Sequence, residues 1–168
     1  MILETERLVL KPINESHIDG LMKLRTHPDV IRYIDRNPPR NSLDVLDFIL
    51  MVKRNCSLQK SIYFVLHLKN NPSILGTICL YNYSEDCTEA EIGYEMLPDF
   101  HGKGLMSEAV KAILEYGFNT LNLHKIIAKT HPENKSSIKL LERFEFLLVE
   151  DDSTDYKFFV LKKSSDKL

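Results

Sequence analysis

The chain has 168 residues, of which 43% are hydrophobic and 27% are charged, and its net charge is −2. This length favours one domain with its own hydrophobic core and is short for two. The acidic pI near 6.3 argues against nucleic acid as the main partner, because binding a phosphate backbone needs a basic surface. No apolar run approaches the roughly 18 residues of a membrane span, so we expect no membrane association.

The N-terminal part predicts a strand followed by helices. Residues 6–13 form a short apolar run that a proline ends, which indicates a strand at a sheet edge. The next stretch, NESHIDGLMKLRTHPDV, has apolar residues at helical spacing and predicts one helix before His27 and a short one after it. The segment RNPPRNS (36–42) interrupts the pattern, and Asn41 or Ser42 then caps a third predicted helix.

The middle of the chain has the composition of strands. Two β-branched, apolar runs at 61–69 and 73–83 are joined by NNP (70–72), which predicts a hairpin. A third run, 88–97, alternates between apolar and polar residues and predicts another strand. Gly93 lies inside this strand, where a glycine indicates a β-bulge or a close approach of the backbone.

The C-terminal part alternates between helices and strands. The pattern predicts a helix over 105–118, a strand over 125–131, a helix over 134–144, and two last strands in LLVEDD and DYKFFVLKK. We expect the final residues, SSDKL, to be a frayed tail. This order predicts a mixed α/β or α+β sheet in one domain that spans residues 1–168, without repeats or linkers.

Cysteine and histidine spacing gives no sign of a metal site. Cys56, Cys79 and Cys87 are odd in number and lack a CxxC pair, so neither a disulfide framework nor a zinc site is indicated. Free thiols are typical of a reducing compartment, and we expect a cytoplasmic protein. Five histidines lack metal-ligand spacing, so we expect them to have surface or core roles: His17, His27, His67, His124 and His131.

Two glycines one residue apart, Gly102 and Gly104, precede the 105–118 helix in PDFHGKGLMSEAV. They either only shape a turn or let a ligand approach the backbone. Such a turn directs free N–H groups and the positive end of the helix dipole at one point, which suits a phosphate, and Lys103 adds charge. The ATP-binding pattern GxxxxGK[ST] is absent, and the dinucleotide pattern GxGxxG would need a glycine where Ser107 stands.

Several motifs carry a family resemblance. HGKGLM before SEAV resembles the pyrophosphate-binding segment [QR]xxGx[GA] of the GNAT superfamily of N-acetyltransferases, and EIGYEMLPDFHGKG is similar to its ribosomal-protein N-terminal (RimJ/RimL-like) branch. LETERLVLKPI, NKSSIKLLERFEF and DYKFFVL also resemble that branch, in the correct order over residues 3–161. The resemblance implies one GNAT-like domain with a mixed, mostly antiparallel sheet that is splayed at its middle and flanked by helices.

The resemblance also implies where acetyl-CoA binds. It assigns the pyrophosphate to the turn and the pantetheine arm to the edge of the 88–97 strand, where main-chain hydrogen bonds can form. The strand residues are Met96 and Leu97, and the turn residues are His101, Gly102, Lys103, Gly104, Leu105, Met106 and Ser107. Three residues depart from the pattern: His101 replaces Gln, Arg or Trp, Met106 replaces Gly or Ala, and Glu145 replaces a glycine that commonly has a positive φ at a helix end.

Catalytic roles follow from the same resemblance. It places the Ser137 hydroxyl near the sulfur as proton donor and makes Asn134 a ligand of pantetheine; the structural alternative is that Asn134 is a helix cap and Ser137 a first-turn serine. Apart from the resemblance, Glu91, beside Gly93, is the candidate general base; the alternative is a solvated carboxylate on the strand face that it shares with Glu89 and Glu95. We expect Tyr94 to pack, while Tyr33 and Tyr83 are possible lining residues of an amine pocket.

The predicted reaction is direct attack of an amine on the acetyl-CoA thioester, without a metal ion. A protein N-terminal amine is the favoured acceptor, with a polyamine or an antibiotic amine as alternatives. A non-catalytic acyl-CoA-binding or regulatory module is the competing function. The sequence leaves the oligomeric state open between monomer and homodimer.

Overall fold

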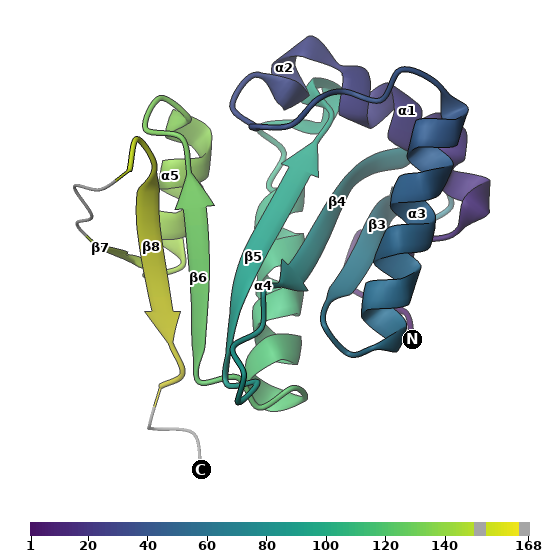
Figure 1. Cartoon of the computed structure of the whole chain (residues 1–168). Coiled ribbons are helices and arrows are strands. Elements are labelled where there is room, and N and C mark those ends of the chain that lie inside the picture. Colours follow the sequence, from purple (N-terminus) through teal and green to yellow (C-terminus); the bar gives the residue numbers. More distant parts are fainter. Residues whose placement is uncertain (150–153, 165–168) are drawn as a thin grey trace.

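A computed structural model of the chain describes residues 1–149 and 154–164. An eight-stranded sheet runs through the molecule in the order β1-β2-β3-β4-β5-β6-β8-β7 (Figure 1). All neighbouring strands pair antiparallel except β5 and β6, which pair parallel. The strands are β1 (Leu3–Glu4), β2 (Leu8–Pro12), β3 (Ile62–Leu68), β4 (Ile74–Tyr81), β5 (Glu89–Met96), β6 (Lys125–Thr130), β7 (Leu147–Val149) and β8 (Lys157–Lys162).

Helices cover both faces of the sheet. The α-helices are α1 (Ile18–Thr26), α2 (Pro28–Ile31), α3 (Ser42–Ser57), α4 (Leu105–Asn119) and α5 (Lys135–Arg143), and two short 3-10 helices are η1 (Glu15–His17) and η2 (Pro98–Phe100). Figure 1 shows α4 behind β4 and β5, with α3 on the opposite face of the sheet. The predicted mixed α/β domain is therefore confirmed.

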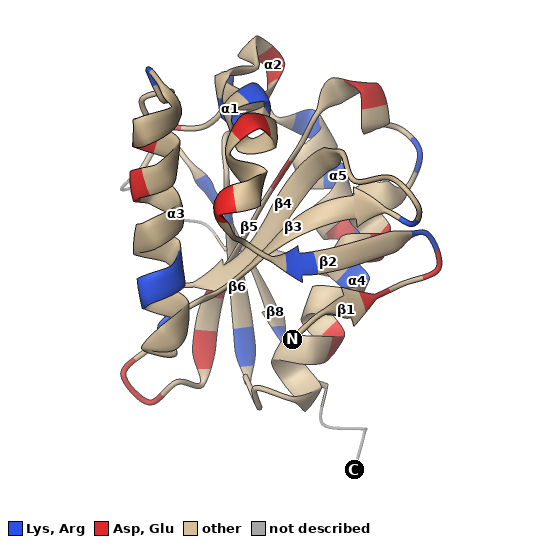
Figure 2. Cartoon of the chain, turned by 90° about the vertical axis from the view of Figure 1, so that its right-hand side faces the viewer, with Lys and Arg blue, Asp and Glu red and all other residues tan. Residues whose placement is uncertain are grey.

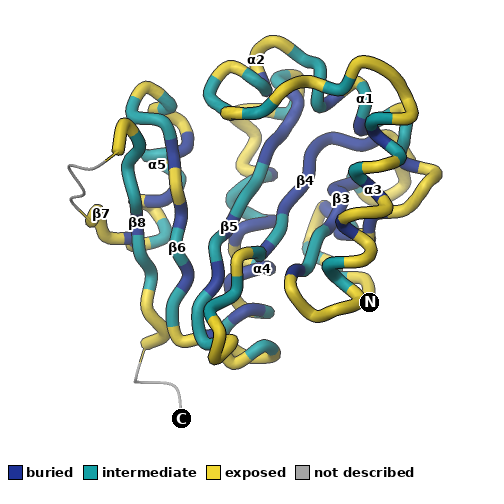
Figure 3. The backbone as a smooth tube through the Cα atoms, in the orientation of Figure 1, coloured by how far each residue is buried: buried dark blue, intermediate teal, exposed yellow. Residues whose placement is uncertain are grey.

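Alternation along the central strands produces two hydrophobic cores. On β3, Phe64 and Leu66 pack with the apolar stripe of α4, whereas Val65 between them packs with α1 and α3. The central strands are the most buried part of the backbone (Figure 3). Each helix on either face is thus attached to the sheet by its own apolar stripe.

Most predicted elements are confirmed at their expected positions, with local differences. The 6–13 strand is present as β2, but the two-residue β1 occupies the sheet edge instead. The register of β4 with β5 runs through Gly93 without a shift, so the bulge expected there is wrong; the shift lies between Leu66 and His67. At Gly93 an added Cβ would come within 3.2 Å of the Cys79 sulfur, so tight packing explains this glycine. The end of the LLVEDD strand and the tail beyond residue 164 lie outside the described residues.

Candidate active site

The sheet opens between β5 and β6, the parallel pair among the described strands. β5 and β6 are paired as far as Ile92 and Ala128, although β5 continues to Met96 and β6 to Thr130. Beyond Ile92 the strands separate, and a cavity of about 1020 Å³ is lined by residues from both sides of the opening as well as by α1, α3 and the segment before α3. This opening is the splay that the family resemblance implies.

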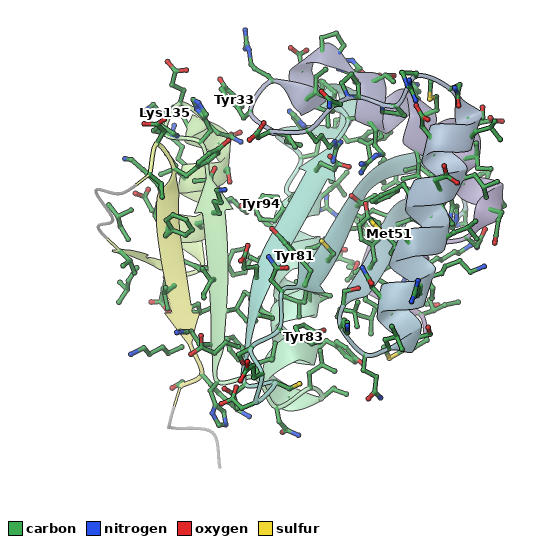
Figure 4. The ribbon with its side chains drawn as sticks, viewed as in Figure 1. Tyr33, Met51, Tyr81, Tyr83, Tyr94 and Lys135 are labelled. Carbon is green, nitrogen blue, oxygen red and sulfur yellow. The ribbon has the colours of Figure 1, made fainter. Side chains whose placement is uncertain are left out.

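Two hydroxyl groups are hydrogen-bonded to each other inside the opening. Tyr94 extends from β5 into the gap toward β6 (Figure 4), and its Oη lies 2.8 Å from the Oγ of Ser137, in the first turn of α5. Both residues line the cavity, and Ser137 is only 9% exposed. Burial raises the pKa of Tyr94 to about 12 although the hydrogen bond with Ser137 opposes the shift, so the phenol is protonated at neutral pH.

Asn134 positions Ser137 through a hydrogen bond at the start of α5. Its Oδ1 accepts a hydrogen bond from the backbone N–H of Ser137 at 3.2 Å and another from the hydroxyl of Ser136, which makes it the N-cap of α5. Asn134 also lines the cavity. The capping role that the sequence left as an alternative is therefore present, and it coexists with a position at the cavity wall.

The two glycines of the turn have backbone conformations that favour glycine. Gly102 has φ +71° and Gly104 has φ +74°, in the left-handed region. Gly104 is the N-cap residue of α4, and no side chain caps this helix, in contrast to the asparagine caps of α3 and α5. An added Cβ at Gly102 would meet nothing within 4 Å. The first turn of α4 thus has backbone N–H groups that no side chain caps, an arrangement that suits an anion.

Two residues of the connection between β1 and β2, Thr5 and Arg7, are hydrogen-bonded to this turn and to the first turn of α4. The Glu108 carboxylate, in the first turn of α4, accepts hydrogen bonds from the backbone N–H and Nε of Arg7, at 2.7 and 2.8 Å, and from the Thr5 hydroxyl. Arg7 also donates from Nη1 to the carbonyl of Lys103 at 2.9 Å. Partial burial raises the pKa of Glu108, but the hydrogen bonds from Thr5 and Arg7 outweigh it and lower the pKa overall. The opening motif of the chain is therefore bonded to the glycine turn.

The remaining turn residues differ in where they lie. His101 donates from Nε2 to the carbonyl of Met96 at 2.8 Å, so its ring binds the end of β5. The Lys103 ammonium donates to the carbonyl of Asp99 at 2.8 Å. Leu105 is buried in the core with α4, Met106 packs against the same core, and Ser107 accepts a hydrogen bond from Arg143 of α5 at 2.8 Å. Leu97 belongs to the core under α1 and α3.

The two carboxylates of β5 nearest the opening have different surroundings. Glu91 accepts a hydrogen bond from Asn82 at 3.1 Å and is not among the described residues that line the cavity. Tyr81 does line it, and burial, together with the charge of Glu91, raises the Tyr81 pKa. Glu95 lies on the strand face that the alternation predicts to be solvated, but only 7% of its side chain is exposed. Its Oε2 lies 2.6 Å from Arg36 Nη2, and its Oε1 lies 3.8 Å from Arg25 Nη1.

Three aromatic side chains that line the cavity, Tyr33, His131 and Tyr156, contact one another. His131, after β6, stacks on Tyr33 with 5.3 Å between ring centroids and meets Tyr156 edge-on at 6.1 Å. Tyr33 comes from the other half of the molecule, as Figure 4 shows. Tyr33 and Tyr83, the two tyrosines named from the sequence, both line the cavity.

Other classes of site are not found in the part of the chain that the structure describes. Within residues 1–149 and 154–164, no three His, Cys, Asp or Glu side chains are grouped so that they could hold a metal ion. All three cysteines are free. No helix of the described residues combines the length and apolar character needed to cross a membrane.

Known proteins resemble this chain in sequence and in fold. Residues 7–147 match the model of the acetyltransferase (GNAT) domain. The chain belongs to the GNAT acetyltransferase family. An uncharacterized N-acetyltransferase, p20, of Bacillus licheniformis is 34% identical over 144 residues, which are 86% of this chain and 81% of p20. The family uses acetyl-CoA as the acetyl donor, and the chain is an acetyltransferase.

Two further relatives differ in their acceptors. The spermidine N(1)-acetyltransferase of Escherichia coli K12 is 23% identical over 90% of this chain and 77% of its own length. The structure of RimL, a ribosomal L7/L12 alpha-N-protein acetyltransferase in complex with coenzyme A, has a TM-score of 0.87 at 16% identity and covers 99% of this chain and 100% of RimL. The second likeness is one of fold.

Proposed function

We propose that this GNAT acetyltransferase moves the acetyl group of acetyl-CoA to an amine, with a protein N-terminal α-amine as the favoured acceptor. The observation that carries the proposal is the Tyr94–Ser137 hydroxyl pair, which lies in the cavity at the opening between β5 and β6. RimL, a ribosomal L7/L12 alpha-N-protein acetyltransferase, supports this acceptor class through its shared fold.

The residues present fit the parts of acetyl-CoA. In our proposal the uncapped N-terminus of α4 with Gly102 and Gly104 binds the pyrophosphate, because N–H groups and the helix dipole both favour an anion there. The edge of β5 that no longer pairs with β6 beyond Ile92 provides main-chain groups for the amide-containing pantetheine arm, next to the Met96 carbonyl that accepts from His101. Asn134, which caps α5 through Oδ1, holds the arm with its amide nitrogen. Acetyl-CoA supplies the acetyl group as a thioester.

The hydroxyl pair serves the departing sulfur. Ser137 donates a hydrogen bond to the sulfur while Tyr94 donates to Ser137, so the developing negative charge is shared between two hydroxyl groups. A thiol has a pKa of about 8.5, so the sulfur needs such a donor at neutral pH. The amine nitrogen bonds to the acetyl carbon as the carbon–sulfur bond breaks, and the proton that the amine loses balances the one that the sulfur gains.

The base must take a proton from an amine that is mostly protonated at neutral pH. We propose that Glu91 acts from beside the cavity, through Tyr81, which is its cross-strand partner on β4 and lines the cavity. Glu95 lies inside the cavity, but its oxygens are engaged by Arg36, Arg25 and the Thr77 hydroxyl. Accepting a proton there would disrupt a buried ion pair, which is costly. Glu91→Gln should therefore lower kcat more than Glu89→Gln on the same strand.

Ligand-induced stabilisation tests the binding half of the proposal. Acetyl-CoA or CoA at about 100 times Kd should raise Tm by about 5 to 10 °C, whereas ATP and NADH should leave it unchanged. Gly104→Glu should abolish the shift because it places a carboxylate where the phosphates bind. No shift with acetyl-CoA or CoA would mean that the glycines only form a turn, as the competing structural interpretation holds.

Turnover tests the catalytic half and the competing function. Ser137→Ala and Tyr94→Phe should each lower kcat about tenfold or more with little change in KM for acetyl-CoA. The double variant should be no slower than the slower single variant, because the hydroxyls act as one unit. Tight CoA binding with no transfer to any amine would favour a non-catalytic CoA-binding module instead.

A further inference from the structure

The cavity has an excess of positive charge that the proposed binding of acetyl-CoA does not use. Its charged lining side chains are Arg25, Arg36, Lys60 and Lys129, against Asp35 and Glu95. The whole chain has the opposite sign, with a net charge of −2, and acidic and basic residues are interspersed over the side shown in Figure 2. The pantetheine arm and the thioester are uncharged, and the proposed phosphate turn is not part of the cavity lining among the described residues.

Arg25 and Arg36, two of these cations, both lie next to the Glu95 carboxylate in the cavity wall. Glu95 lies 2.6 Å from Arg36 Nη2 and 3.8 Å from Arg25 Nη1, and both arginine side chains are mostly buried. Arg25 is also fixed by Phe48, whose ring centre is 3.7 Å from the guanidinium carbon. Burial and then repulsion by Arg36 lower the pKa of Arg25, while Glu95 raises it. One acidic group therefore faces two guanidinium groups.

Arg36 has a donor without an acceptor. Its Nε is buried and has no hydrogen-bond partner in the described part of the chain. Leaving a buried charged donor unsatisfied is unfavourable, so this group needs an explanation, and an acceptor atom on a bound ligand would provide one. A guanidinium that uses Nη2 for Glu95 can still offer Nε to a carboxylate oxygen.

We propose that Arg36, with Arg25 beside it, binds an acidic group of the acceptor, so that the substrate is an amine carrying a carboxylate near its amino group. The inference rests on the proposed acetyl transfer and narrows its acceptor. A polyamine, like any polycation, has a second ammonium group that would meet uncompensated arginine charge here. The carboxylate comes either from an acidic side chain near a peptide N-terminus or from the α-carboxylate of a free amino acid.

Binding of product peptides tests this without depending on turnover. The probes are Nα-acetylated, C-terminally amidated Ser-Glu-Glu, Ser-Gln-Gln and Ser-Lys-Lys, titrated by calorimetry into the CoA-saturated protein; N-acetylserine and its amide test the free amino acid. We expect one acidic probe to bind about tenfold tighter or more than its neutral counterpart, as a charge-assisted hydrogen bond provides, with the lysine peptide weakest. Which acidic probe binds identifies the source of the carboxylate.

The variants are chosen to separate recognition from folding. Arg36→Gln combined with Glu95→Gln removes both charges of the pair, so no buried charge is left alone, and it should abolish the preference. Arg36→Lys keeps the charge but lacks Nε and should reduce it. Arg54→Gln removes one positive charge from α3 at an exposed residue outside the cavity lining, and this control variant should keep the preference.

Each outcome decides one of the two proposals. Equal or tighter binding of the neutral or lysine peptide, no binding of any probe, or an unchanged preference in the double variant would overturn the acidic-acceptor inference. Acetylation of spermidine in preference to every acidic amine would do the same while leaving acetyl transfer intact. The expected order of binding, without transfer to the matching unacetylated amines, would instead overturn the proposed function.

Discussion

Replacing Glu145 by glycine should stabilise the protein. The helix α5 ends in a Schellman motif, in which the N–H of Glu145 donates to the carbonyl of Glu142 and the N–H of Phe146 donates to the carbonyl of Leu141. Glu145 has φ +62°, as the sequence predicts for a position where a glycine is usual. Its side chain is exposed, so the substitution removes little packing.

The expected magnitude follows from two opposing costs. A left-handed conformation costs a residue with a Cβ about 1 to 2 kcal/mol, whereas glycine loses about 0.5 to 1 kcal/mol through its freer unfolded chain. The net gain of about 1 kcal/mol should raise Tm by about 2 to 4 °C in a domain of this size.

Thermal and urea unfolding measure this gain, with Glu142→Gly as the matched control. Glu142 is an exposed residue inside the same helix, so glycine there should lower the free energy of unfolding by about 0.5 to 1 kcal/mol. Opposite signs at the two positions would support the reasoning. A Tm that is unchanged or lower in Glu145→Gly would refute it, because the left-handed residue would then carry no relievable strain.

Two further predictions concern the turn and the pH dependence. Glu108→Gln weakens the hydrogen bonds to Arg7 and should raise KM for acetyl-CoA several-fold with little change in kcat, whereas the exposed Glu115→Gln should change neither; a fall in kcat alone would contradict a positioning role. Burial lowers the pKa of both His17 and His67, whose rings lie 5.4 Å apart. The unfolded chain, with pKa values of about 6.5, then binds more protons than the folded protein, so the free energy of unfolding should fall as pH drops below about 6.5. His67→Gln should flatten this pH dependence of the urea midpoint, and equal midpoints at neutral and mildly acidic pH in the unsubstituted protein would contradict the shifts.

Local chemistry explains why the fold could be predicted well. Asparagine caps, the breaker at 36–42 and strict alternation along β5 act within a few residues, so the sequence displays them directly. At Gly93 the sequence left a bulge and a close approach as alternatives, and the bulge is wrong; the side chains that need the space, Cys79 and Tyr81, come from the neighbouring strand. Cross-strand packing of this kind is not visible in a local pattern.

The site was predicted less completely for the same reason. The glycine turn is contiguous, and the positive φ at Gly102 and Gly104 agrees with what their spacing suggests. Tyr94 was expected only to pack, because its partner Ser137 is 43 residues away. Glu95 was grouped with its exposed neighbours, since its arginine partners come from α1 and from the segment before α3. Arg36 lies in the segment RNPPRNS, whose local pattern predicts a break between helices and carries no sign of a partner 59 residues away.

The division of the molecule has a consequence for how its specificity can change. In our proposal the acceptor is recognised mainly by side chains of α1, α3 and the segment between them, which come from one contiguous stretch between β2 and β3, whereas the turn, α4 and α5 come from the chain after β5 (Figure 1). Most residues proposed to recognise the amine and those proposed to handle the thioester are thus encoded in separate blocks of sequence, which meet at the opened strands and where Tyr33 stacks on His131. A graft of residues 13–60 from a relative should exchange acceptor preference in a single step and leave the affinity for coenzyme A as it was.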